Sequence, residues 1–140
     1  MNFVLDASVA LLWLVPETNR AGIDYADGTL KALKESRAVV PSLFALEVAN
    51  VVAKLESKRL VTEADAQRFI ALLGRLNIVT DQATAAHALG DTLNLARRYK
   101  LSAYDAAYLE LALRTGSSLA TLDAGLVKAA RVAGVPIFGA

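Results

Sequence analysis

Short apolar runs alternate along this chain with longer segments in which apolar residues recur at helical spacing. Such runs suit a buried β-strand, whereas a helix needs a longer segment. Strands that are apolar throughout are typical of a parallel sheet covered by helices on both faces. The runs predict strands at residues 3–5, 38–40, 77–79, 119–121 and 136–138.

The segments between these runs predict helices at residues 7–15, 19–36, 43–59, 63–74, 83–99, 102–116 and 123–134. Pro16 should end the first of them, Ser42 and Thr62 are expected as helix caps, and Gly116 suits the position just after a helix. We therefore expect an α/β domain of three layers, with helices on both sides of a central, mostly parallel sheet of four to five short strands. No linker or repeat divides the sequence, so residues 1–140 are expected to form a single domain.

The composition excludes several classes of function. The absence of cysteine rules out disulfides and thiolate metal sites, and a net charge of +1 provides no strong overall field for nucleic acid. The N-terminus lacks the basic stretch of a signal peptide, and the apolar run at 9–15 is too short to span a bilayer. We expect a cytoplasmic protein without membrane contact. Its hydrophobic content of 55% predicts apolar surface that meets a partner chain.

Four acidic residues stand where a parallel sheet would bring them together. Asp6 directly follows the first predicted strand, and Asp123 lies two residues after Thr121 at the end of the fourth. Ligands of such sheets bind at the carboxyl ends of the strands. Asp105 begins a predicted helix, and Glu47 lies in an apolar helix, where a carboxylate is costly unless it is paired or binds a metal.

Each acid also has a structural alternative. Asp6 and Asp123 could cap the helices that follow them, Asp105 could form a capping box with Ser102, and Glu47 could extend to solvent. Together, however, four carboxylates at one edge would raise each other's pKa unless a cation neutralised them. Ligands that are all oxygen suit Mg²⁺ or Mn²⁺, which can activate a water for attack on a phosphodiester.

Four motifs, in this order along the chain, resemble the PIN-domain family, and within it the VapC-type toxin ribonucleases of toxin–antitoxin pairs. Each motif contains one of the four acids, and together they span nearly the whole chain. The motifs are VLDAS at 4–8, PSLFALEVANV at 41–51, LSAYDAAY at 101–108 and LATLD at 119–123.

The resemblance implies a PIN-like fold and a function for each matched residue. One or two Mg²⁺ or Mn²⁺ ions would be held by Asp6, Glu47, Asp105 and Asp123. The hydroxyls of Ser8 and Thr121 would support these acids, and Asn50 would orient Glu47. The family cuts RNA, often tRNA or rRNA, and its members are usually homodimers inhibited by a cognate antitoxin whose tail enters the active site.

Other features leave two interpretations open. Lys54, on the same helical stripe as Glu47, could contact RNA phosphates or simply be a solvated side chain. Trp13 could contact a partner chain or pack in the core. The alternative function is a non-catalytic α/β module that binds a nucleotide or a protein and keeps an acidic pocket. A phosphate-binding module would need a glycine-rich loop, whereas the first predicted strand is followed by Asp6-Ala7-Ser8.

Overall fold

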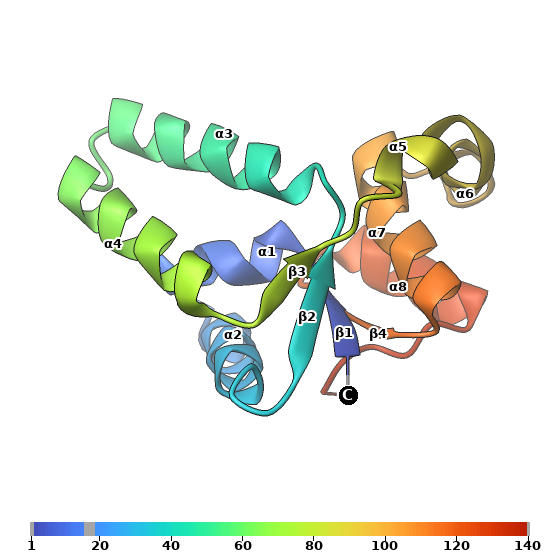
Figure 1. The fold of residues 1–140 in the computed structure, drawn as a ribbon, viewed down its shortest axis with the longest axis horizontal. Helices are drawn as coiled ribbons and strands as arrows, with labels where there is room; N and C mark the ends of the chain where they lie inside the picture. The colour runs from blue at the N-terminus through green and yellow to red at the C-terminus, as the bar shows by residue number, and fades with distance from the viewer. Residues whose placement is uncertain (1, 16–18, 140) are drawn as a thin grey trace.

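The computed structural model describes residues 2–15 and 19–139. Its centre is a four-stranded sheet in the order β3-β2-β1-β4, and every pair of neighbouring strands is parallel. All the carboxyl ends therefore lie at one edge (Figure 1). The strands are β1 (Asn2–Leu5), β2 (Arg37–Val40), β3 (Ile78–Thr80) and β4 (Ser118–Ala120).

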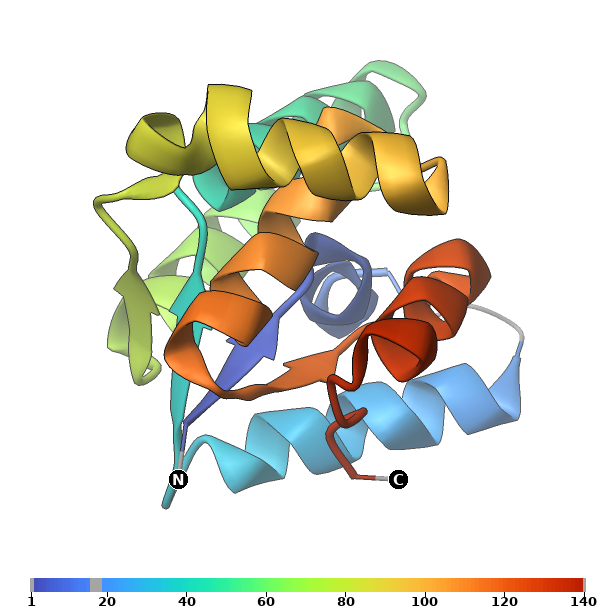
Figure 2. The same cartoon turned by 90° about the vertical axis from the view of Figure 1, so that its right-hand side faces the viewer.

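Helices cover both faces of this sheet, as the apolar runs predicted. Figures 1 and 2 place α7 and α8 on one side of it and α3 and α4 on the other. The helical elements are α1 (Ala7–Ala10), the 3-10 helix η1 (Leu11–Trp13), α2 (Arg20–Ala32), α3 (Phe44–Ser57), α4 (Glu63–Arg75), α5 (Thr84–His87), α6 (Leu93–Tyr99), α7 (Ala103–Thr115) and α8 (Ala124–Ala133). The expected three-layer α/β architecture is confirmed.

The central strand β1 anchors the core. Phe3, Val4 and Leu5 are fully buried, and Phe3 lies beside Ala38 of β2 and Ser118 of β4. Burial on both faces explains the continuous apolar run, and it places the next residue of the chain at the carboxyl edge of the sheet.

The expected fifth strand at 136–138 is reduced to a single parallel bridge between Ile137 and Leu119. The N–H of Leu119 donates to Pro136, and Phe138 donates back to Leu119. Pro136 has no N–H of its own, which limits the length of this ladder. The Phe138 ring stacks on Phe3 with centroids 4.1 Å apart, so the segment still closes the core.

The predicted helix at 83–99 is interrupted. A π-helical segment, η2 (Ala88–Thr92), separates α5 from α6. A π-helical turn contains more residues than an α-helical turn. Gly90, within this segment, has no side chain to obstruct the wider turn. Leu89, within this segment, is 88% exposed, whereas Leu93, at the start of α6, is half-buried.

Helix ends follow the expected signals with one exception. Thr62 forms a full capping box with Asp65, and Gly116 adopts a left-handed conformation with φ of 64° after α7. Ser42 is not the cap of α3: Leu43 occupies that position, and the Ser42 N–H donates instead to Thr84 Oγ1. Pro16, expected to end the first helix, lies outside the described residues.

Among the helices that the structure describes, none is long and apolar enough to cross a membrane.

Candidate active site

Asp6 lies at the carboxyl end of β1 and is 4% exposed. Its Oδ2 accepts hydrogen bonds of 2.7 Å from both Ser8 Oγ and Thr121 Oγ1. It occupies the N-cap position of α1, but its carboxylate makes no capping bond there. The Ser8 backbone lowers the pKa of Asp6 less than the two hydroxyls do, so the buried carboxylate is held mainly by these hydroxyls and not by a helix-capping bond.

Asp123 begins α8, and its Oδ2 accepts a 2.8 Å bond from the N–H of Leu126. Its own N–H donates to Thr121 Oγ1 at 3.1 Å, so one threonine hydroxyl contacts both Asp6 and the turn that leads to Asp123. Asp123 is exposed. The capping alternative thus holds for this acid, alongside its position near Asp6.

Glu47 lies in the first turn of α3 and is half-buried. Its Oε1 accepts a 2.5 Å hydrogen bond from the hydroxyl of Tyr108 on α7. We expected Asn50 to orient Glu47. Asn50 is exposed, and within 2–15 and 19–139 no hydrogen bond joins it to Glu47. The bond from Tyr108 to Glu47 was not predicted, although the spacing of Tyr108, three residues after Asp105, places it beside that acid on one helix.

Asp105 forms only half of the expected capping box. Its N–H donates to Ser102 Oγ at 3.0 Å, but within the described chain the Asp105 carboxylate does not accept the return bond from the Ser102 N–H that would complete the box. In the complete box of α4, the Asp65 carboxylate does accept the bond from the Thr62 N–H. The Asp105 carboxylate therefore does not cap the Ser102 N–H, although the Ser102 hydroxyl lowers its pKa.

The negative charges of these acids raise one another's pKa values. Burial raises the pKa of Asp6, and its two hydroxyl donors oppose this, while the charge on Asp123 adds to it. Burial also raises the pKa of Glu47, against the Tyr108 bond, with further increases from Asp6 and Asp105. The pKa of Asp105 is raised by burial, then by Asp123 and Asp6. Three partly desolvated carboxylates and Asp123 thus repel one another at one edge of the sheet.

The chemistry of these four carboxylates suits a divalent cation. All the donors are oxygens, and a cation would offset both the burial and the repulsion. As placed here, however, no group of three or more Asp, Glu or His side chains among the described residues could hold an ion. Mg²⁺ commonly binds through one or two carboxylates with water completing its shell. The site therefore fits such an ion with few direct ligands, and a third carboxylate would have to move closer.

The structure also places Lys54 and Trp13, the two residues with open alternatives. Lys54 is exposed on α3, two turns after Glu47. The indole N–H of Trp13 donates a 2.9 Å bond to the Ala26 carbonyl on α2, and its half-buried ring packs against the core. Core packing therefore accounts for Trp13 without a partner chain.

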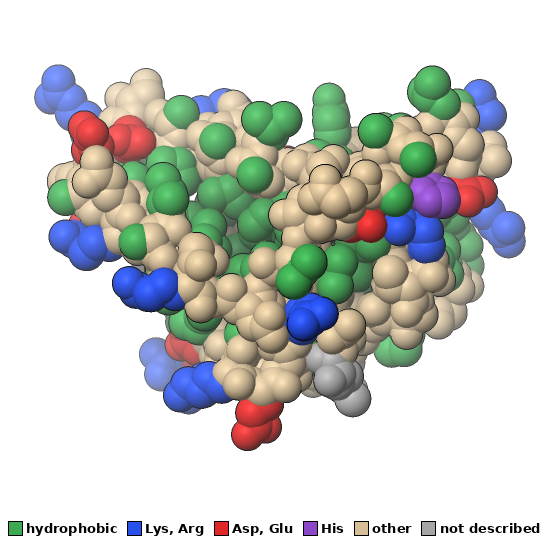
Figure 3. All heavy atoms as spheres, viewed as in Figure 1, with side chains coloured by type: hydrophobic (Ala, Val, Ile, Leu, Met, Phe, Trp, Pro, Cys, Tyr) green, Lys and Arg blue, Asp and Glu red, His purple; other side chains and the backbone are tan. Residues whose placement is uncertain are grey.

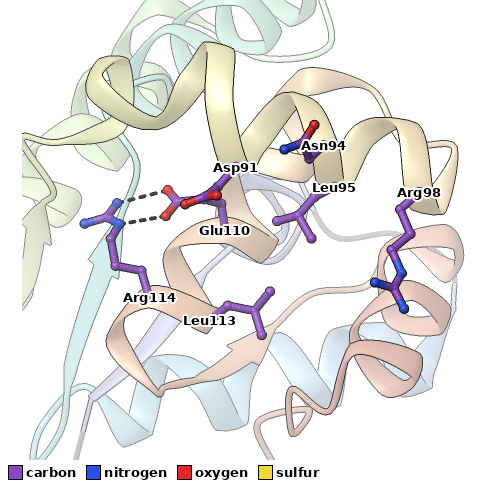
Figure 4. A pocket seen from close by; sticks show the side chains of 7 residues that line it. All are labelled: Asp91, Asn94, Leu95, Arg98, Glu110, Leu113 and Arg114. Carbon is purple, nitrogen blue, oxygen red and sulfur yellow. Dashed lines mark hydrogen bonds and ion pairs between the residues drawn. The ribbon is translucent and has the colours of Figure 1, made fainter.

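Two hollows lie outside the acidic edge. One, of about 530 Å³, lies between α3 and α4, where Figure 3 shows hydrophobic side chains lining the gap. The other, of about 370 Å³, lies between α6 and α7 (Figure 4). There Arg114 bonds both oxygens of Glu110 and also Asp81. Glu110 is ion-paired with Arg114 and only 4% exposed.

An all-parallel sheet with acids gathered at its carboxyl edge defines an α/β domain with a candidate metal site. The model of the PIN domain matches residues 3–132. The chain therefore belongs to the PIN-domain family, as the four motifs indicated.

Known proteins similar to this chain agree with that assignment. It is 30% identical over 128 residues to Ribonuclease VapC3 of Pyrobaculum aerophilum, covering 91% of this chain and 94% of the relative. The fold is shared with VapBC2 from Rickettsia felis, solved bound to a DNA fragment from their promoter, with a TM-score of 0.68, 17% identity, and coverage of 98% and 97%. A toxin–antitoxin complex from Klebsiella pneumoniae gives a TM-score of 0.58, 19% identity, and coverage of 86% of each chain.

Proposed function

We propose that this PIN domain, taken as residues 1–140, is a Mg²⁺- or Mn²⁺-dependent endoribonuclease that acts as the toxin of a toxin–antitoxin pair. The main support is Asp6, a 4% exposed carboxylate at the carboxyl end of the central strand, close enough to Asp123 for that charge to raise its pKa. A buried acid among other acids is costly in any fold without a cation. The similarity to a protein named as a ribonuclease adds the class of reaction.

The ion would be held by Asp6, Glu47 and Asp105, with Asp123 contributing at the exposed side. When bound, it would supply the activation of water and the positive charge that phosphodiester hydrolysis needs. The chain itself supplies the hydroxyls of Ser8 and Thr121, which hold Asp6 in one orientation. Since Asp6 is central among the acids, its loss should cost the most activity.

The substrate and partners follow from the same proposal. RNA, with tRNA or rRNA as the expected targets, would approach the acidic edge, and the exposed Lys54, two turns after Glu47 on α3, would contact a phosphate. A cognate antitoxin would inhibit the protein, which would act in the cytoplasm as a homodimer. The structural relative described as a toxin–antitoxin complex supports an antitoxin partner.

Induced expression of the chain without an antitoxin tests this proposal. Wild type should slow growth and fragment cellular RNA, and Asp6→Asn should do neither. Asp27→Asn is the matched control, because Asp27 is exposed on α2, away from the acidic edge, and it should remain toxic. Equal toxicity of wild type and Asp6→Asn, or intact RNA in arrested cells, would instead favour the non-catalytic binding module.

A further inference from the structure

Tyr108 is a buried polar side chain to which the four-acid pattern assigns no role. It is 0% exposed, and its hydroxyl donates to Glu47 Oε1 at 2.5 Å. A phenylalanine would fill the same apolar space. A buried tyrosine hydroxyl requires a partner, and here the partner is the acid on α3 that no helix-capping role explains.

The hydroxyl of Tyr108 lies where three acid-bearing segments meet. Its pKa is raised above the usual range by burial, by the bond to Glu47 and by the nearby charge of Asp6, and the backbone of Ala7 partly opposes this. The group therefore remains a proton donor at neutral pH. It connects α7, which carries Asp105, to α3 and to the end of β1.

Asp6 and Glu47 show the same pattern of hydrogen bonding. One oxygen of Asp6 accepts from Ser8 and Thr121, and one oxygen of Glu47 accepts from Tyr108. No side chain within 2–15 and 19–139 bonds the second oxygen of either carboxylate. Neutral hydroxyls thus fix each acid in one orientation and leave its second oxygen without a side-chain partner among the described residues, which suits a cation bound through single carboxylate oxygens.

We infer that Tyr108 is a positioning residue of the nuclease site, whose hydroxyl holds Glu47 Oε1 and so keeps Oε2 available to a cation that would bind there. This inference rests on the proposed function. It predicts that the hydroxyl matters for cation affinity, beyond its contribution to packing.

Tyr108→Phe tests the inference, because it removes the hydroxyl and keeps the ring. Calorimetric titration of the whole chain with Mn²⁺ should show affinity about 10- to 100-fold weaker than wild type. RNA cleavage should fall by a similar factor at limiting Mn²⁺ and recover in part at high Mn²⁺. A cooperative thermal transition in EDTA would show that the variant folds.

The matched control is Tyr99→Phe, the same change in a half-buried tyrosine on α6 that bonds no carboxylate among the described residues. It should bind Mn²⁺ as wild type does. In a Glu47→Ala background, Tyr108→Phe should cause no further loss of Mn²⁺ affinity, whereas a merely structural role would cause the same loss in both backgrounds.

Different results would overturn the positioning role of Tyr108 and the proposed nuclease function. If wild type binds Mn²⁺ and cuts RNA while Tyr108→Phe binds Mn²⁺ equally well, the positioning role is overturned and the nuclease proposal stands. If wild type neither binds Mn²⁺ nor cuts RNA, the proposed function fails and the role of Tyr108 fails with it.

Discussion

The hydroxyl of Thr121, just after β4, donates a 2.7 Å hydrogen bond to Oδ2 of Asp6, just after β1. The two strands are neighbours in register, with Leu5 beside Ala120, so the contact follows directly from parallel pairing. The same oxygen of Thr121 accepts from the Asp123 N–H. A single side chain therefore supports the most buried acid of the site and the turn that carries another.

Thr121→Val should impair both stability and cleavage. It leaves the Asp123 N–H without its acceptor and Asp6 without one donor, which should lower the free energy of unfolding by about 1–3 kcal/mol. RNA cleavage should fall by about 10- to 100-fold. Urea unfolding and single-turnover cleavage measure the two effects. Thr115→Val is the control, since its exposed hydroxyl bonds only the Leu111 carbonyl and Ser117, and its cleavage rate should not change.

The stability of the metal-free protein should increase as the pH is lowered from 7 toward 5. Asp6, Glu47 and Asp105 all have raised pKa values in the fold, so above about 4, their usual value, the folded chain binds more protons than the unfolded one. Acidification through that window therefore favours folding. At pH values below about 4, the protein should lose stability again. The pKa values of Asp65 and Asp81 are lowered in the fold, so protonation of these two carboxylates disfavours folding.

Urea unfolding in EDTA at pH 7 and pH 5 measures this effect. Wild type should be more stable at pH 5 than at pH 7, and part of this gain should come from Asp6, because burial raises the pKa of that carboxyl. Asp6→Asn, which cannot titrate, should show a smaller gain and should already be more stable than wild type at pH 7. An identical pH dependence in the two proteins would contradict a raised pKa for Asp6 in the folded chain.

Two substitutions of Asp123 should separate its structural contribution from its catalytic contribution. Asp123→Asn keeps an oxygen for the Leu126 N–H and removes only the charge. Asp123→Ala also removes the cap and should lower the free energy of unfolding by a further 0.5–2 kcal/mol, roughly. Both should reduce RNA cleavage less than Asp6→Asn does. Cleavage lost as completely as in Asp6→Asn would give this exposed acid a larger role than its position indicates.

The Arg114→Ala variant should be less stable than wild type, while the four acids of the candidate active site should keep their arrangement. Arg114 neutralises Glu110, whose side chain is 5% exposed, and also bonds Asp81. Removal of one partner from a buried pair costs about 3–5 kcal/mol, and the partial exposure of Arg114 should reduce this to about 2–3 kcal/mol. Arg20→Ala, in the exposed pair with Asp24, is the control and should cost less than about 0.5 kcal/mol. Equal losses would show that Glu110 is not dependent on Arg114.

The sequence predicted the strands because burial on both faces leaves a direct record in the apolar runs of β1 and β2. It also indicated the edge at which Asp6 lies, since the residue after a parallel strand has little choice of position. Segments such as 83–99 were less predictable. A π-helical turn costs little where Gly90 permits it, and it leaves no distinct pattern in the sequence.

The contacts within the site were also beyond local sequence patterns. Asn50 is near Glu47 in sequence and was the natural candidate to hold it, yet the bond comes from Tyr108, which lies 61 positions away. Helix packing decides such contacts. Similarly, the sequence Ser102-x-x-Asp105 predicts a capping box equally well whether or not the carboxylate turns toward its helix end.

The most direct test of the account is cleavage of total RNA by purified protein with Mg²⁺, with Mn²⁺ or with EDTA. Wild type should cut in either metal and stop in EDTA, and Asp6→Asn should not cut under any of the three conditions. Cleavage that persists in EDTA or survives Asp6→Asn would contradict the account, and so would the absence of cleavage by wild type with either metal.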